Sequence, residues 1–141
     1  MRFFLTIHFC FFLSFFSFSQ GLMDPKNSTT RQDTLRGSIT AERSWWDLNY
    51  YHLDISVNPE KKYIEGSNLV YYTVLNSNNV LQIDLQEPLE LLMAKQEGEE
   101  LEIHKEGNAY FITLKKDQIL GSLEKIKLFY KGNPREAVNA H

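Results

Sequence analysis

The feature that most constrains this chain is the stretch from Trp45 to Leu75, which contains two alternating segments separated by a turn. In the first segment every second position is apolar: Tyr51, Leu53, Ile55 and Val57. This period of two predicts a strand that buries these four side chains on one face. Pro59 then breaks the pattern, because proline has no N–H to donate to a sheet. The second segment, residues 63–75, ends in a run that is apolar on both faces, which predicts a strand covered on both sides.

Five shorter segments follow, at residues 80–85, 89–93, 101–104, 110–114 and 126–130. Turn residues such as Glu97-Gly98 and Gly107-Asn108 separate them. Leu89, Leu91 and Met93 are expected to form one buried set. The pattern contains no convincing amphipathic helix and no internal repeat. It predicts an all-β fold, an antiparallel β-sandwich or open barrel of roughly seven strands.

Residues 1–19 are expected to be a signal peptide. Arg2 precedes an apolar run from Phe3 to Phe18, and the small residues of Ser17-Phe18-Ser19 place cleavage before Gln20. The alternative is a membrane anchor, but the run is shorter than the roughly twenty apolar residues that span a bilayer. We therefore expect export to the periplasm or outside, with no stable membrane span after cleavage. Cys10, the single cysteine, lies in this leader, so the exported chain would contain no disulfide.

Residues 20–44 are polar and show no sustained period, which predicts an extended arm ahead of a β-sandwich domain at residues 45–141. Asn27-Ser28-Thr29 matches the short N-glycosylation pattern, which is common by chance. Trp45-Trp46 closes the arm. Two adjacent aromatics before a strand favour an anchor on the core, and the alternative is a stacking platform for a ligand such as a sugar. Adjacent strand residues point to opposite faces, so only one of the two could join a platform.

Charge and motifs exclude several functions. The net charge of −3, with both signs interleaved, argues against nucleic-acid binding. After the leader the histidines are His52, His104 and His141, and none has the spacing of a zinc site, so solvated strand histidines are expected. Phosphate-binding loops and the G-x-S-x-G motif of hydrolases are absent. We predict no catalytic, cofactor-binding or metal-binding residue in this chain.

Two further clusters have simpler interpretations than a site. An acidic group, with a spacing that matches no calcium loop, is expected to be a solvated hairpin that protects a sheet edge: Glu97, Glu99, Glu100 and Glu102. Three Gly-Ser pairs are expected to form turns or bulges: Gly37-Ser38, Gly66-Ser67 and Gly121-Ser122.

A family resemblance extends over residues 33–139. Residues 33–47 (DTLRGSITAERSWWD) and 51–57 (YHLDISV) resemble the opening of a bacterial aminopeptidase N-like zinc metallopeptidase of the secreted, Bacteroidetes type. Residues 64–72, beginning Ile-Glu-Gly, resemble the next strand of that family. Residues 80–85 (VLQIDL) and 126–132 (IKLFYKG) resemble later ones.

The resemblance implies a saddle-shaped N-terminal domain that packs on a thermolysin-like catalytic domain and walls its peptide cavity. In that family zinc is held by an H-E-x-x-H motif and a distant Glu, and the first Glu activates water. The chain ends at His141, before all of these and before a substrate-binding loop, so no site residue can be carried over. Zinc would belong to the full-length enzyme, and this chain alone is expected to be inactive.

A different class of function is a stand-alone exported binding module for a carbohydrate or a protein partner. It predicts an aromatic platform that contains Trp45 or Trp46 and no large exposed apolar face. The metallopeptidase-domain hypothesis predicts the opposite, an apolar face where a second domain docks.

Overall fold

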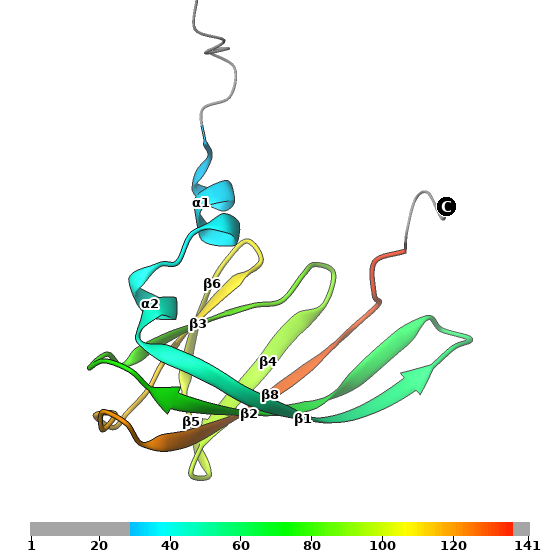
Figure 1. Ribbon diagram of the computed structural model, residues 1–141. Coiled ribbons are helices and arrows are strands. Elements are labelled where there is room, and N and C mark those ends of the chain that lie inside the picture. Colours follow the sequence, from blue (N-terminus) through cyan, green and yellow to red (C-terminus); the bar gives the residue numbers. More distant parts are fainter. Residues whose placement is uncertain (1–28, 137–141) are drawn as a thin grey trace, which may run out of the picture.

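The computed structural model describes residues 29–136. Two short helices, α1 (Arg31–Gly37) and α2 (Ala41–Ser44), precede all strands (Figure 1). The strands are β1 (Trp46–Asn58), β2 (Tyr63–Val74), β3 (Val80–Asp84), β4 (Glu90–Gln96), β5 (Glu99–Glu100), β6 (Glu102–Glu106), β7 (Ala109–Thr113) and β8 (Leu123–Gly132). The predicted leader, residues 20–28 of the arm with Asn27 and Ser28, and His141 lie outside the described residues.

The strands form two antiparallel sheets, which confirms the predicted all-β, sandwich-like fold. The larger sheet has the order β1-β2-β8-β4-β5, and the smaller has the order β3-β7-β6. Eight strands replace the expected seven because the two-residue β5 pairs separately with β4 at the Glu97-Gly98 turn. No helix among the described residues is long and apolar enough to cross a membrane.

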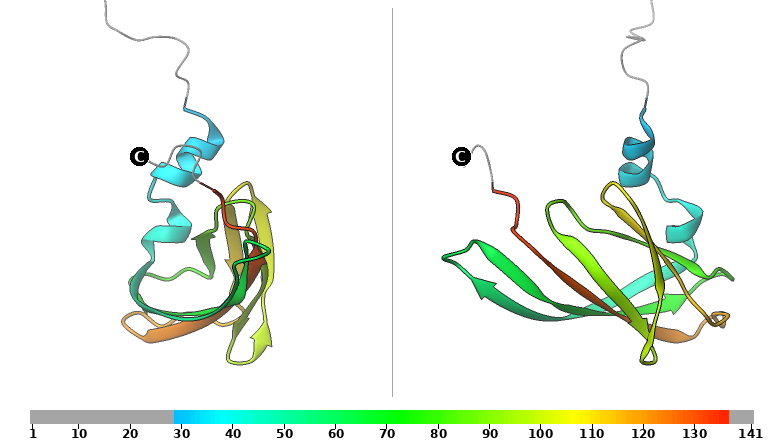
Figure 2. Two further views of the ribbon diagram at one scale, coloured as in Figure 1. Left: turned by 90° about the vertical axis from the view of Figure 1, so that its right-hand side faces the viewer. Right: turned by 180° about the vertical axis from the view of Figure 1, so that it is seen from behind.

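The long hairpin of β1 and β2 projects away from the smaller sheet (Figures 1 and 2). Its turn is closed as the sequence predicts. The Lys61 backbone N–H donates to Asn58 Oδ1 at 3.0 Å, and the Lys62 N–H donates to the Pro59 carbonyl at 3.2 Å. Lys62 adopts a φ of 48°, the left-handed conformation that ends such a turn.

Gly66 does not form the expected turn or bulge. It lies within β2, directly opposite Ile55 of β1. A Cβ atom at Gly66 would stand 2.1 Å from the Asp54 carbonyl oxygen, so the two backbones approach here more closely than any side chain permits. By contrast, Gly121 does occupy a turn, at a φ of 78°.

The core lies between the smaller sheet and one end of the larger sheet. Its largest fully buried apolar side chains are Trp45, Tyr72, Leu81, Ile112, Ile126, Val70 and Val74. Three of these come from β2, where the chain was expected to be covered on both sides. Only one face of β2 is fully covered. On the other face Tyr71 is partly buried, and its ring stacks on that of Tyr50 with the ring centroids 4.2 Å apart.

The tryptophan pair anchors the chain on the core, as predicted. Trp45 is 2% exposed and donates its indole N–H to the Val80 carbonyl at 2.7 Å. Trp46 is partly buried and donates to the Glu42 carbonyl at 3.0 Å. Both rings meet Tyr72 edge to face, at centroid distances of 6.0 and 5.8 Å. The expectation that they face opposite sides is wrong, because Trp45 precedes the strand.

The predicted buried set of Leu89, Leu91 and Met93 is wrong at Met93, which does not share a face of β4 with Leu91. The register shifts between them, so that Leu91 stands opposite Tyr130 and Met93 stands opposite Phe129. An extra residue in one strand moves the following side chains to the other face. Ala94, rather than Met93, enters the core.

The arm was expected to be extended, and the structure corrects this for its described part. Thr30 and Asp33 form a capping box at the start of α1, which satisfies backbone N–H groups that the first turn leaves free. Leu35 is buried at 2% exposure, and Arg31 pairs with Glu106 of β6 at 3.0 Å. A seven-residue helix is marginal by itself, so these tertiary contacts hold it.

Tyr72 brings a polar network into the core. Its hydroxyl donates to Gln118 Oε1 at 2.9 Å and accepts from Gln96 Nε2 at 3.2 Å. Burial raises the pKa of the Tyr72 hydroxyl well above its ordinary value. The folded state therefore holds this proton more tightly than the unfolded state. The resulting stabilisation is fully present below about pH 10, the unfolded pKa, and is lost as the pH rises through the folded pKa.

We expect Tyr72→Phe to lower the free energy of unfolding by about 1–2 kcal/mol at pH 8, because two buried amides lose a partner. Between pH 8 and 11 the variant should lose less stability than the wild type, since this tyrosine no longer ionises on unfolding. Urea unfolding at both pH values measures this. Tyr63→Phe, at the partly exposed start of β2, is the control. An equal loss in wild type and Tyr72→Phe would contradict the prediction.

Candidate functional site

A row of exposed apolar side chains lies on the inner face, by which we mean the face of the five-stranded sheet that the three-stranded sheet covers at one end. The four side chains of β1 that were expected to be buried lie on it but are exposed: Tyr51 49%, Leu53 55%, Ile55 43% and Val57 62%. Their partners across β2 are Val70, Asn68, Gly66 and Ile64. The alternation was therefore correct, and the predicted burial was wrong.

Strand length explains this exposure. β1 has 13 residues and β2 has 12, so each extends about 40 Å at 3.3 Å per residue. The strands of the covering sheet have five residues each and extend about 17 Å. They cover the end of the inner face near Trp46 and Val74 and leave the end near the hairpin turn open to solvent.

A cavity of about 330 Å³ lies where the cover stops, and we call it the inner groove. Its apolar lining comes from both sheets and the β3–β4 connection: Tyr51, Leu53, Ile64, Val70, Ile83, Leu85, Leu89, Leu91, Leu128 and Tyr130. Asn68 lies among them, opposite Leu53 and Leu128. Its Oδ1 is buried without a hydrogen-bond partner among the described residues. Such orphaned acceptors are rare in native folds.

The electrostatics of the groove follow from its apolar walls. Loss of water around their hydroxyls raises the pKa of Tyr51 and of Tyr130 above the ordinary tyrosine value. Both rings therefore stay neutral at physiological pH. A surface of this kind suits apolar side chains. Asp84 is the one carboxylate in its lining, and it is engaged by Arg43 and by Gln82 Nε2.

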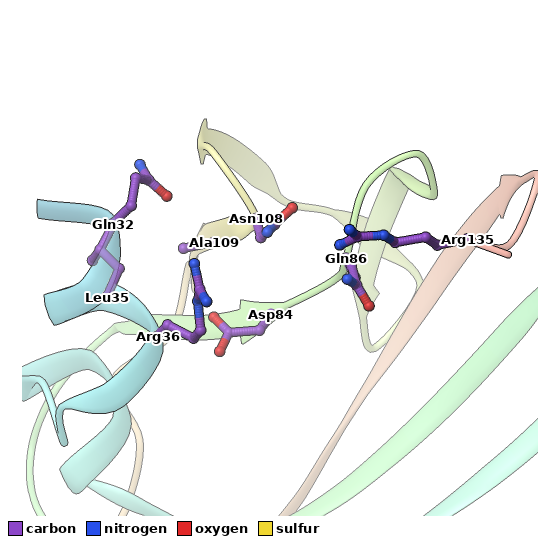
Figure 3. A pocket seen from close by; sticks show the side chains of 8 residues that line it. All are labelled: Gln32, Leu35, Arg36, Asp84, Gln86, Asn108, Ala109 and Arg135. Atoms are coloured by element: carbon purple, nitrogen blue, oxygen red, sulfur yellow. The ribbon is translucent and has the colours of Figure 1, made fainter. Parts of the chain in front are cut away.

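A second hollow, of about 320 Å³, lies between α1 and the loops that follow β3 and β6 (Figure 3). Arg36 reaches it from α1, and Arg135 reaches it from the segment after β8, beside Gln86 (Figure 3). Asp84 also lines it, and its carboxylate pairs with Arg43 and accepts from Gln82 Nε2 at 3.0 Å. This carboxylate is therefore already paired, and the other polar side chains that line the hollow are arginines and amides.

Asn68 and the second hollow, beside α1, were not predicted from the sequence. A signal for α1 was present, since Thr30 and Asp33 have the spacing of a capping box and Leu35 follows as its apolar residue. The alternation gave no signal for Asn68, because a polar residue at an inner position is indistinguishable from an outward one until the register is known.

The residues considered for a metal site do not come together. His52 lies on the outer face of β1 and His104 on β6, and both are exposed, as predicted. Glu97 and Glu99 pair with Lys116 and Lys115. Within residues 29–136 no group of three or more His, Cys, Asp or Glu side chains could hold a metal ion. Zinc therefore does not fit the described part of the chain.

Comparison with known proteins finds likeness in fold. No protein-family model matches the chain, and no curated protein sequence does. An M1 zinc metallopeptidase from Deinococcus radiodurans matches with a TM-score of 0.58 and 17% identity over 65% of this chain. A mutant of that enzyme bound to a Tyr-Ser-Ala substrate matches with a TM-score of 0.60 and 16% identity over 68%. The matches span 21% and 22% of those chains, so this chain resembles one domain of each.

Proposed function

We propose that this chain is a non-catalytic N-terminal domain of an exported zinc aminopeptidase of the M1 type, and that its inner groove docks on the catalytic domain. The observation that carries the proposal is the exposed apolar end of the inner face, in a fold that resembles a domain of M1 zinc metallopeptidases. Monomeric proteins rarely leave such a face open without a partner. In the assembled enzyme the domain would wall the cavity in which peptides lose their N-terminal residues.

Chemistry in this proposal belongs to the partner domain, and the groove supplies only binding. Apolar side chains of the catalytic domain would fill the space between Leu53 and Leu91. Asn68 Oδ1 would then accept a hydrogen bond that no described residue provides. The competing carbohydrate-binding hypothesis requires an aromatic platform that contains Trp45 or Trp46. Trp45 is instead buried in the core, and Trp46 packs on Tyr72.

The decisive test is the source DNA beyond the codon for His141. An open frame that encodes H-E-x-x-H and a following Glu supports the proposal. A stop codon with no such motif nearby overturns it. The protein encoded by the longer frame should hydrolyse amino-acid anilides and lose that activity with a chelator. Chelator-sensitive hydrolysis by the 141-residue chain alone would contradict the non-catalytic role.

The groove itself is tested with a dye that fluoresces on apolar surfaces. The wild-type chain should bind 8-anilinonaphthalene-1-sulfonate in its native state, and Leu53→Asp should reduce the fluorescence several-fold because a charge then lies in the groove. Leu123→Asp is the matched control, since Leu123 is 63% exposed and lies outside the groove. Equal fluorescence from both variants would show that the dye binds elsewhere.

A further inference from the structure

β1 forms one edge of the five-stranded sheet, and among residues 29–136 its only paired strand is β2. Pairing with β2 is regular from Tyr50 to Asn58. Successive residues of an antiparallel strand direct their N–H and C=O groups alternately to the two sides. About half of these groups along β1 therefore face outward and can pair with another strand.

This edge has few of the features that prevent strands from joining. Between Tyr50 and Asn58 there is no proline and no lysine, and Asp54 provides the one carboxylate. The register shift lies at one end of the strand, between Leu48 and Tyr50. The inner side chains are apolar and exposed. Long, apolar edges of this kind bind a further strand unless they are blocked.

We propose that the edge of β1 pairs antiparallel with β1 of a second copy of this chain, with the two-fold axis beside Leu53. A two-fold axis perpendicular to the sheet keeps the two inner faces on the same side. Because side chains alternate between faces, inner residues must then stand opposite inner residues, and the axis lies between the two copies of one residue. An axis beside His52 sets histidine opposite histidine, and one beside Asp54 sets carboxylate opposite carboxylate. The axis beside Leu53 instead sets His52 of each copy opposite Asp54 of the other.

Charge complementarity on the outer face thus selects one register. In that register Leu53 stands opposite its own counterpart on the inner face, and Tyr51 stands opposite Ile55. Cross-strand apolar pairs and a His–Asp pair are both favourable contacts between neighbouring strands. The pairing uses the outward backbone edge of β1, although Tyr51 and Leu53 also line the inner groove, so the proposal does not depend on the proposed domain function.

Disulfide capture tests the register. In the full chain with Cys10→Ser, which removes the one native cysteine, Leu53→Cys should form a disulfide-linked dimer. Opposed residues have Cα atoms about 4.5–5.5 Å apart, within the range of a disulfide. Val57→Cys is the matched control on the same strand and face, and it is more exposed. Its two copies would lie eight positions apart, or about 26 Å, and should not link.

Crosslinking of Leu53→Cys alone supports the proposal. Equal crosslinking of both variants indicates non-specific association, and no crosslinking of either indicates a free or differently covered edge. Each of these two results would overturn the proposal.

A charge exchange provides a second measurement that needs no cysteine. His52→Asp places two carboxylates opposite each other at two points and should weaken the dimer roughly fivefold in sedimentation equilibrium. Adding Asp54→His to the same chain exchanges the two residues and should restore the wild-type affinity. Both side chains are exposed, so folding should be unchanged. If the double variant associates no better than His52→Asp alone, the proposed register is wrong.

Discussion

Trp45→Ala is expected to lower the free energy of unfolding by about 3–5 kcal/mol, the range for removal of a buried aromatic ring from a core. Trp45 is 2% exposed, meets Tyr72 edge to face and is the largest fully buried side chain. Its loss also leaves the Val80 carbonyl without its indole donor. Because a domain is typically stable by about 5–15 kcal/mol, this one change should remove a large part of the total.

Urea unfolding followed by circular dichroism measures this effect. Trp45→Phe keeps most of the ring but not the N–H, so it should cost less, about 1–3 kcal/mol. Leu123→Ala, on a side chain that is 63% exposed, is the control and should change stability by less than about 0.5 kcal/mol. A loss below about 1 kcal/mol for Trp45→Ala would contradict the role of this residue as the anchor between arm and core.

Gly66→Ala is expected to destabilise the β1–β2 hairpin by about 3 kcal/mol, the upper part of the range for overpacking. The new Cβ would meet the Asp54 carbonyl oxygen at 2.1 Å and Ile55 Cα at 3.0 Å. Both atoms belong to the backbone, so no side-chain rotation can relieve the contact. The strands must move apart and lose ladder hydrogen bonds on both sides of the substitution.

Hydrogen exchange of backbone amides shows where this loss occurs. Protection of backbone amides from exchange should fall in residues 50–58 and 63–70. It should remain in β7 and around the buried residues Ile126 and Leu128 of β8. Gly37→Ala is the matched control, because a Cβ atom there meets nothing within 4 Å and alanine favours the helix. Unchanged protection of the hairpin in Gly66→Ala would show that the two backbones are farther apart than the structure places them.

The order of the strands along the chain could be predicted from the sequence, because alternation and turn chemistry are local. Tyr110, Ile112 and Leu114 are buried as their spacing predicts, and the Gly107-Asn108 hairpin forms between β6 and β7. Local signals also predicted that His52 and His104 lie exposed on strands. The register shift in β4 could not be foreseen, since it depends on how that strand pairs with β8.

The candidate site could be predicted from the sequence only in part. The sequence by itself determined that Tyr51, Leu53, Ile55 and Val57 share one face, because side-chain direction follows from a period of two. Only the tertiary structure decided that this face is uncovered, because coverage depends on the lengths and positions of strands that are distant in sequence. It also decided that Gly66 is a contact point between strands. For α1 the capping-box spacing of Thr30 and Asp33 was a local signal, and the burial of Leu35 and the Arg31–Glu106 pair hold the helix. Coverage and close backbone approach depend on non-local contacts, which no local pattern encodes.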